Sequence, residues 1–473
     1  MPRSGSSGGP RRALVVVVVA LAAVVTALAA PSAISALSAS APETSIDTAG
    51  GGADTASSLR DQAGAESAAS LRDQVRDGTL DRSHGLLKTC GLCRSRMVAA
   101  APGAASALST DKPVGWGADD LATALHLPAQ DPGHDRHGAV AVITGGAYPV
   151  EESDLAAYRA QYGLPACTVA NGCLTITGFD GGPAPEPTNA RYDQGAAMEA
   201  ALDVDMASAS CPSCRIIDVK IPAEDGIPGP VEKMHKTMGD IAQAVDTAIA
   251  LGADAVSMSL GLPNDNSPEA QALGRRLIHP GVAIVAASGD TGWELTDKIG
   301  WPANLPWVTA AGGVNLTRQG NAFTQSAWPY AGSGCDTNQP AASGAPETAK
   351  AACGGHRAAA DVSAVAENVA FYITYTPLAS QHPPHWTIGD GTSLSSPFIA
   401  GLYARGGHTT GVRGPNTIYS APGGAFTDIT TGKNVNSDEG QASCPADAPA
   451  LCEAGPGWDG PTGVGTPNGL SGF

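Results

Sequence analysis

Ser393 is the residue of this chain best placed to act as a nucleophile. It lies in the segment Gly389-Asp-Gly-Thr-Ser-Leu-Ser-Ser-Pro-Phe-Ile-Ala-Gly401, where glycines and a threonine lead into an apolar run. This pattern predicts a strand-to-helix turn, with Ser393 at the N-terminus of the helix. Free backbone N–H groups and the positive end of the helix dipole stabilise negative charge at such a position. The setting therefore suits a serine that attacks a carbonyl group.

The histidines of the chain do not provide a persuasive base for this serine. His137 precedes an apolar run that predicts a strand, and no His-Gly-Thr-His run occurs. A lone histidine titrates near neutrality without needing a role. We therefore interpret four others as surface or loop residues: His235, His279, His382 and His385.

Glu199 and Asp203 are the better candidates for the base. They lie four residues apart in Met198-Glu-Ala-Ala-Leu-Asp-Val-Asp-Met-Ala, so on a helix they share one face. Two ionised acids at this spacing repel each other, so one can hold a proton for the other and the pair titrates as a unit. A pair of solvated surface acids is the alternative that the pattern leaves open.

Asp290 is a third acid that could take part in the same chemistry. It lies in Ala286-Ala-Ser-Gly-Asp-Thr-Gly292, a glycine-flanked turn after a predicted strand. A protonated carboxyl group there could donate a hydrogen bond to an oxyanion, which requires an acid medium or a raised pKa. The alternative is a turn aspartate that accepts bonds from neighbouring N–H groups.

From Gly138 onward, apolar runs typical of strands alternate with helical patterns. The predicted strands are 139–144, 215–220, 255–260, 282–287 and 307–312, and the predicted helices are 151–162, 238–251 and 268–277, after a short helix near 118–125. This alternation predicts an α/β fold with a mostly parallel central sheet and helices on both faces. Functional sites of such sheets gather at the carboxyl ends of the strands.

The N-terminal region predicts export. Residues 1–36 contain early arginines, an apolar run at 13–30 and then small residues, which is the pattern of a signal peptide. The alternative is a retained membrane anchor, because the apolar run is close to spanning length. Residues 37–111 are rich in Ala, Ser, Gly and charged residues, so we expect a short, largely flexible pro-segment before a domain at 112–473.

Charge and cysteine content fit an exported protein. The net charge is −18, so no basic face is available to neutralise nucleic-acid phosphates. Ten cysteines fall into five close pairs, which predicts local disulfides in an oxidising compartment. Zinc bound by the two Cys-x-x-Cys pairs, Cys90/Cys93 and Cys211/Cys214, is the alternative.

The ordered motifs resemble those of the sedolisins, the serine-carboxyl peptidases. The resemblance covers roughly residue 112 to the C-terminus and rests on three motifs: Glu199-x-x-x-Asp203, Ser288-Gly-Asp290-x-Gly292 and Gly391-Thr-Ser393-x-x-x-Pro397. It implies a subtilisin-like core in which Glu199 is the general base for Ser393. It further implies that Asp203 orients and tunes Glu199, and that Asp290 stabilises the oxyanion.

The same resemblance extends to a calcium site near the C-terminus. It implies one Ca²⁺ held by the carboxylates of Asp428 and Asp459 and by the carbonyl groups of Ile429, Gly455 and Gly457. Hard oxygen ligands on a glycine-bent loop suit calcium. The alternative is a Gly- and Pro-rich turn region with incidental acids. An insert with Cys444 and Cys452 separates the two halves, and we expect it to be a surface excursion closed by a disulfide.

The leading hypothesis is therefore a secreted, monomeric serine-carboxyl endopeptidase that acts on proteins and peptides at acid pH and is made as a zymogen. A carboxylate is a weaker base than imidazole, so it can act at a pH where histidine is already protonated. A catalytically silent relative that binds peptides or cell-wall partners is the main alternative. An α/β-hydrolase would require Gly-x-Ser-x-Gly around the nucleophile, which Ser393 lacks. Candidate substrate-lining loops are 262–268 and 330–338.

Overall fold

The computed structural model describes residues 72–77, 86–88, 96–98, 112–129, 138–223, 229–293, 299–375, 386–407, 411–435 and 443–473. All of them belong to the unit Ser58–Phe473. The expected signal peptide at 1–36 lies outside the described residues. Within the described part of the chain, no helix is long and apolar enough to cross a membrane.

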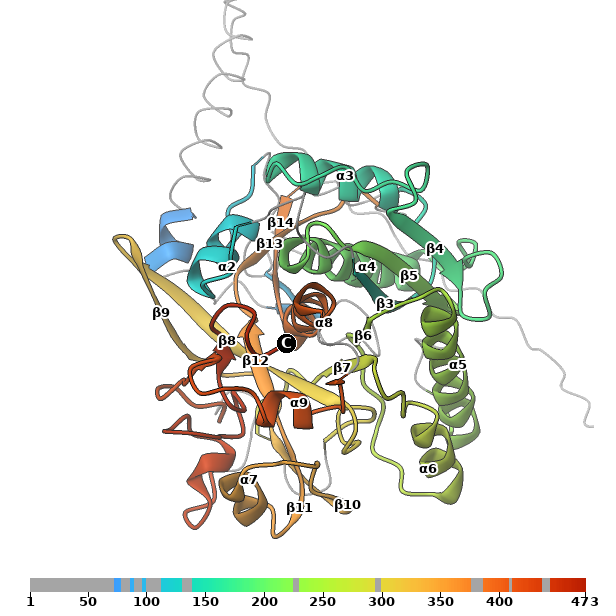
Figure 1. The fold of residues 1–473 in the computed structure, drawn as a ribbon. Coiled ribbons are helices and arrows are strands. Elements are labelled where there is room, and N and C mark those ends of the chain that lie inside the picture. Colours follow the sequence, from blue (N-terminus) through green and yellow to red (C-terminus); the bar gives the residue numbers. More distant parts are fainter. Residues whose placement is uncertain are drawn as a thin grey trace, which may run out of the picture. The chain divides into compact units, whose positions relative to one another are not determined.

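The centre of this unit is a mostly parallel sheet (Figure 1). Its strands follow the order β12-β8-β7-β6-β3-β5-β4, all parallel, and β9 pairs antiparallel with β8. The strands are β3 (Ala139–Gly145), β4 (Leu174–Gly178), β5 (Arg215–Ile221), β6 (Ala255–Met258), β7 (Ala283–Ala287), β8 (Thr309–Gln319), β9 (Ala322–Ala327) and β12 (Val362–Val365). The predicted α/β class with a parallel sheet is thus confirmed.

Helices cover both faces of the sheet because the inner strands are apolar on both sides. Side chains such as Val140 and Val142 pack with α4 (Ala190–Ser210) and α8 (Thr392–Gly406). Alternate residues such as Ala141 and Ile143 pack with α5 (Val231–Ala250) and α6 (Pro268–Arg275). The shorter helices are α2 (Ala118–Ala124), α3 (Glu151–Gln161), α7 (Glu347–Ala352) and α9 (Asn416–Tyr419).

The two central helices, α4 and α8, pack directly on each other (Figure 1). The Asn189 side chain caps α4, where its Oδ1 accepts a hydrogen bond from the Tyr192 N–H at 3.1 Å. α8 follows Gly391, whose φ of 145° favours glycine, and ends before Gly407 in a left-handed conformation. These local signals fix where each helix begins or ends.

An antiparallel sheet leads into α8. β13 (Val369–Tyr372) pairs with β14 (Trp386–Asp390), and β2 (Arg96–Val98) adds to the other edge of β14, followed by β1 (Leu86–Lys88). A further small sheet joins β10 (Gly334–Pro340) to β11 (His356–Ala359), and β15 (Phe426–Thr427) pairs with β16 (Thr466–Pro467). The nucleophile therefore closely follows β14, an inner strand of this sheet.

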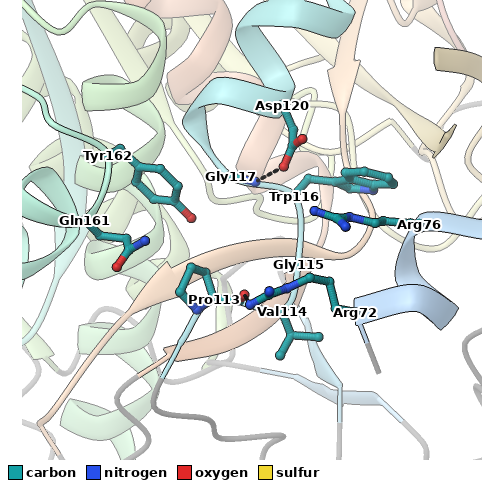
Figure 2. A pocket seen from close by; sticks show the side chains of 10 residues that line it. All are labelled: Arg72, Arg76, Pro113, Val114, Gly115, Trp116, Gly117, Asp120, Gln161 and Tyr162. Atoms are coloured by element: carbon teal, nitrogen blue, oxygen red, sulfur yellow. Dashed lines mark hydrogen bonds between the residues drawn. The ribbon is translucent and has the colours of Figure 1, made fainter. Parts of the chain in front are cut away.

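Parts of the expected pro-segment take regular structure. Residues 72–77 form a helix in which Val75 is fully buried, and the Arg72 guanidinium donates to the Pro113 carbonyl at 2.7 Å. An open cavity of about 190 Å³ lies beside this helix. Figure 2 shows Trp116 and Tyr162 among the residues that line it. This helix contacts residues after 112, and β2 pairs with β14 while β1 pairs with β2, so these pieces of segment 37–111 take regular structure.

Among the described residues, four disulfides join close cysteine pairs, as the sequence predicts. They are Cys167–Cys173, Cys211–Cys214, Cys335–Cys353 and Cys444–Cys452. The Cys211/Cys214 pair is therefore a disulfide, which contradicts its use as a zinc ligand pair. Cys90 and Cys93 lie outside the described residues.

Candidate active site

Ser393 lies at the second residue of α8 and is fully buried. Strand β14 and the turn at Gly391 place it there, as the sequence pattern predicts. Its hydroxyl donates a hydrogen bond to the Ser259 carbonyl at 3.4 Å. In the described part of the chain, no histidine bonds to this hydroxyl; His235 and His279 instead pair with Asp265 and Asp246.

Ser259 connects Ser393 to the acid pair. It directly follows β6, and its hydroxyl lies 2.6 Å from Asp203 Oδ1 and 3.2 Å from the Ser393 carbonyl. From the sequence, Ser259 was predicted only as part of the strand at 255–260. Its position at the carboxyl end of a parallel strand is the signal that could have marked it.

Glu199 and Asp203 are both buried on α4, with exposed fractions of 4% and 0%. The alternative of a solvated surface pair is therefore wrong. Burial raises the pKa of Asp203 well above its ordinary value, and the neighbouring Glu199 charge raises it further, whereas the Ser259 hydrogen bond opposes the rise. Such a pair holds one proton over a pH range where an exposed aspartate would be ionised.

Asp290 lies at the N-terminus of the nucleophile helix. Its Oδ1 accepts hydrogen bonds from the Thr392 N–H and the Thr392 hydroxyl, both at 2.8 Å. These partners are 102 residues away in the chain, so Asp290 is more than a turn aspartate with local bonds. The Thr392 hydroxyl oxygen also accepts a hydrogen bond from the Gly289 N–H at 3.1 Å, which connects the turn after β7 to α8.

Residues of the predicted calcium site also lie together. Asp428 Oδ2 accepts from the Gly457 N–H at 2.9 Å, and Asp459 Oδ2 accepts from the Gly455 N–H at 3.1 Å. Burial raises the pKa of Asp459 to about 7, and the Asp428 carboxylate adds to the rise. A cation would relieve this repulsion, so the residues fit calcium. No described group of three or more His, Cys, Asp or Glu side chains could hold a metal, so carbonyl groups such as that of Ile429 would have to complete the site.

Comparison with known proteins finds peptidases that are similar in sequence and in fold. The Subtilase family profile matches residues 208–406, and the chain is 28% identical to kumamolisin from Bacillus sp. (strain MN-32) over 382 residues. A solved structure of Pseudomonas sedolisin, described as a serine-carboxyl proteinase, shares the fold with a TM-score of 0.55 and 19% identity, covering 76% of this chain and 96% of that one. The chain is thus similar in sequence to the subtilases and to kumamolisin, and similar in fold to sedolisin.

The sedolisin-like match is partial in length. It covers 74% of this chain and 62% of kumamolisin, so the chain spans about three fifths of that relative. A second relative, tripeptidyl-peptidase sed5 from Aspergillus fumigatus, is 28% identical over 236 residues, 41% of this chain and 38% of that protein. The Subtilase match includes Asp290 and Ser393 but not Glu199 and Asp203. The part shared with subtilases is therefore the nucleophile side of the site.

Proposed function

We propose that this protein is a serine-carboxyl endopeptidase that hydrolyses peptide bonds in proteins at acid pH. The observation that carries the proposal is the link from Ser393 through Ser259 to the buried Asp203, on the helix that also bears Glu199. A buried carboxyl pair beside a serine at a helix N-terminus has the parts of an acid-tuned nucleophilic site.

In the proposed reaction, Glu199 removes the proton of the Ser393 hydroxyl as its oxygen attacks the substrate carbonyl carbon. Asp203 holds the second proton of the pair and keeps Glu199 oriented. The oxyanion receives hydrogen bonds from the Ser393 N–H and from protonated Asp290. Glu199 then returns the proton to the leaving amine, and water releases the acyl group from Ser393 by the same steps.

Acid pH follows from this choice of groups. An ionised Glu199 can act below the pH at which a histidine base is protonated, and Asp290 can donate only while it keeps its proton. Activity therefore requires the window in which the pair has lost one proton and Asp290 has lost none.

Calcium is proposed as a structural ion. Asp428, Asp459 and the carbonyl groups of Ile429, Gly455 and Gly457 would hold it, and its positive charge would bind loops that otherwise carry two neighbouring carboxylates. Among the described residues, none of the hydrogen bonds given above connects the calcium site to Ser393 or to the Glu199–Asp203 pair. We therefore propose that the ion stabilises the fold and takes no part in catalysis.

We also propose that the protein is secreted as a monomeric zymogen. The described disulfides support an oxidising compartment, and segments 1–36 and 37–111 would be the signal peptide and the pro-segment. The ordered pieces at 72–77, 86–88 and 96–98 would then be released or retained on activation.

Digestion of an unfolded protein substrate from about pH 3 to about pH 7 tests the proposal. We expect an acid optimum, and loss of activity in Ser393→Ala and Glu199→Ala. Ser395→Ala is the matched control, because Ser395 is equally buried on α8 but its hydroxyl donates to the Ala364 carbonyl at 3.1 Å. A folded wild type that stays inactive after removal of the proposed pro-segment would favour the silent peptide-binding relative. Activity that survives Ser393→Ala would exclude the proposed nucleophile.

A further inference from the structure

A buried lysine lies among carboxylates at the edge of the candidate site. Lys220, at 1% exposure, places its Nζ 2.6 Å from Asp218 Oδ2, 3.0 Å from Glu151 Oε2 and 3.3 Å from the Thr144 hydroxyl. Thr144 in turn donates to Asp218 Oδ1 at 2.5 Å. Charges buried this deeply carry a large desolvation cost, and a hydrophobic cluster of similar volume is often at least as stable. Stability alone therefore gives little reason for this cluster.

The sheet register places Lys220 in the same row as Ser259. On β3, Thr144 is paired with Lys220 of β5, and the preceding Ile143 is paired with Met258 of β6. Ser259 follows Met258, so it continues the row beyond Thr144, with strands about 4.8 Å apart. Ile143 and Met258 point toward α5, and side chains alternate along a strand. Thr144, Lys220 and Ser259 therefore face α4 and α8, where Ser259 meets Asp203 and Ser393.

The groups around this row are mostly acidic. Asp218 comes from β5, Glu151 from α3, and Glu199 and Asp203 from α4, while the Tyr148 ring lies 5.9 Å from Lys220 Nζ. The pKa of Asp203 is raised by burial, by Glu199 and by Asp218, and it is lowered by Lys220. Without a positive charge, removing even one proton from the Glu199–Asp203 pair would leave an unbalanced cluster of negative charge.

We propose that Lys220 is a positioning residue for the Glu199–Asp203 pair, supplying the positive charge that allows this buried pair to lose one proton and act as a base. Asp218, Glu151 and Thr144 hold the ammonium in place, and Asp218 moderates its effect. This inference rests on the proposed function, because it assigns the pair the role of base. A purely structural Lys220 would instead only join β5 to α3.

The test is the dependence of kcat/KM on pH for a peptide substrate. In Lys220→Met, the acid limb should move up by about one pH unit, because losing a unit charge one or two strand spacings away disfavours ionisation of the pair. Lys220→Arg should keep the limb near its wild-type position. Asp218→Asn should move the limb in the opposite direction, because it removes a negative charge that raises the pKa of Asp203.

The proposal is supported if the acid limb moves to higher pH in Lys220→Met and to lower pH in Asp218→Asn. A loss of packing alone would lower the activity of both variants but would not shift their acid limbs in opposite directions. Unmoved limbs, or shifts of the same sign, overturn it. If Lys220→Met does not fold, Asp218→Asn and Glu151→Gln decide, and both must move the limb to lower pH. Ser393→Ala, measured in parallel, distinguishes failure of this inference from failure of the proposed function. If Ser393→Ala is inactive but the acid limb stays in place in the Lys220 and Asp218 variants, only the role of Lys220 is refuted. If Ser393→Ala is active, the proposed function itself is refuted.

Discussion

Ser259 is the residue that joins the two halves of the site. Its hydroxyl donates to Asp203 and contacts the Ser393 carbonyl, and its own carbonyl accepts from the Ser393 hydroxyl. Ser259→Ala should lower kcat about 10-fold or more, because a small misplacement of the reacting groups is costly. The acid limb should also move to higher pH, because the Ser259 hydrogen bond lowers the pKa of Asp203 in the wild type and its loss raises that pKa. A pH–rate profile that keeps its acid limb in place would refute this role.

Asp290 should combine a structural and a chemical role. Its Oδ1 anchors Thr392 next to the nucleophile, and the remaining oxygen is the proposed oxyanion donor. Asp290→Ala should lower kcat about 100-fold or more. Asp290→Asn keeps an acceptor and gains a permanent donor, so it should retain more activity and lose the alkaline limb that reports Asp290. Equal losses in both variants, measured by kcat at several pH values, would argue against a donor role.

Sequence patterns predicted the main candidate residues of the site but not the contacts that join them. The four-residue spacing of Glu199 and Asp203 and the turn before Ser393 could be recognised locally. Ser259 and Lys220 could not, because their roles depend on which strands are neighbours and on the register between them. Burial of the acid pair could not be predicted either, because it depends on the packing of α4 against α8.

At the scale of elements, the crossing of α4 and α8 sets the distance between base and nucleophile. A Cβ added at Gly401 of α8 would lie 2.0 Å from Ser210 Oγ of α4. Gly401→Ala should therefore push the helices apart, with a loss of about 1–3 kcal/mol in the free energy of unfolding. It should also reduce kcat, because α4 carries Glu199 and α8 carries Ser393.

The controls for this crossing are available in the same chain. Gly423→Ala should leave stability and activity unchanged, because a Cβ there meets nothing within 4 Å. Adding Ser210→Ala to Gly401→Ala removes the clashing hydroxyl and should restore part of both losses. Thermal unfolding and kcat measured on the four proteins check this; a Gly401→Ala protein as stable and active as wild type would mean that the crossing is not tight.

Regular elements were predicted best where an apolar run or helical spacing was clear in the sequence. The strand expected at 139–144 is β3 (Ala139–Gly145), and the helix at 151–162 is α3 (Glu151–Gln161). The helix predicted at 238–251 in fact begins at Val231. The sequence did not indicate this start, because the first turns are polar and partly exposed. Strands β10 to β13 were not predicted beforehand, since three of these four strands are only four residues long.

At the scale of the whole molecule, calcium should stabilise the C-terminal region. Saturating calcium at about 100 times its Kd adds about 2.7 kcal/mol, so a chelator should lower the melting temperature by roughly 3–6 °C. The shift should vanish in Asp428→Asn and Asp459→Asn and persist in the exposed control Asp447→Asn. An unchanged melting temperature after chelation of the wild type would contradict the proposed ion.

Domain organisation was predictable only in outline. The composition of residues 37–111 indicated a flexible segment, yet the buried Val75 and the pairing of β2 with β14 connect pieces of it to residues after 112. Such short elements depend on a partner surface supplied by distant residues, so local composition does not predict them.

The pH dependence of kcat/KM on a peptide substrate tests the central claim most directly, because the acid limb reports the base that activates Ser393. A carboxylate base predicts an acid limb below about pH 5, activity retained at about pH 4, and near-complete loss of activity in Glu199→Gln. An acid limb near about pH 6.5, the range of a histidine base, or an unaffected Glu199→Gln would contradict the account.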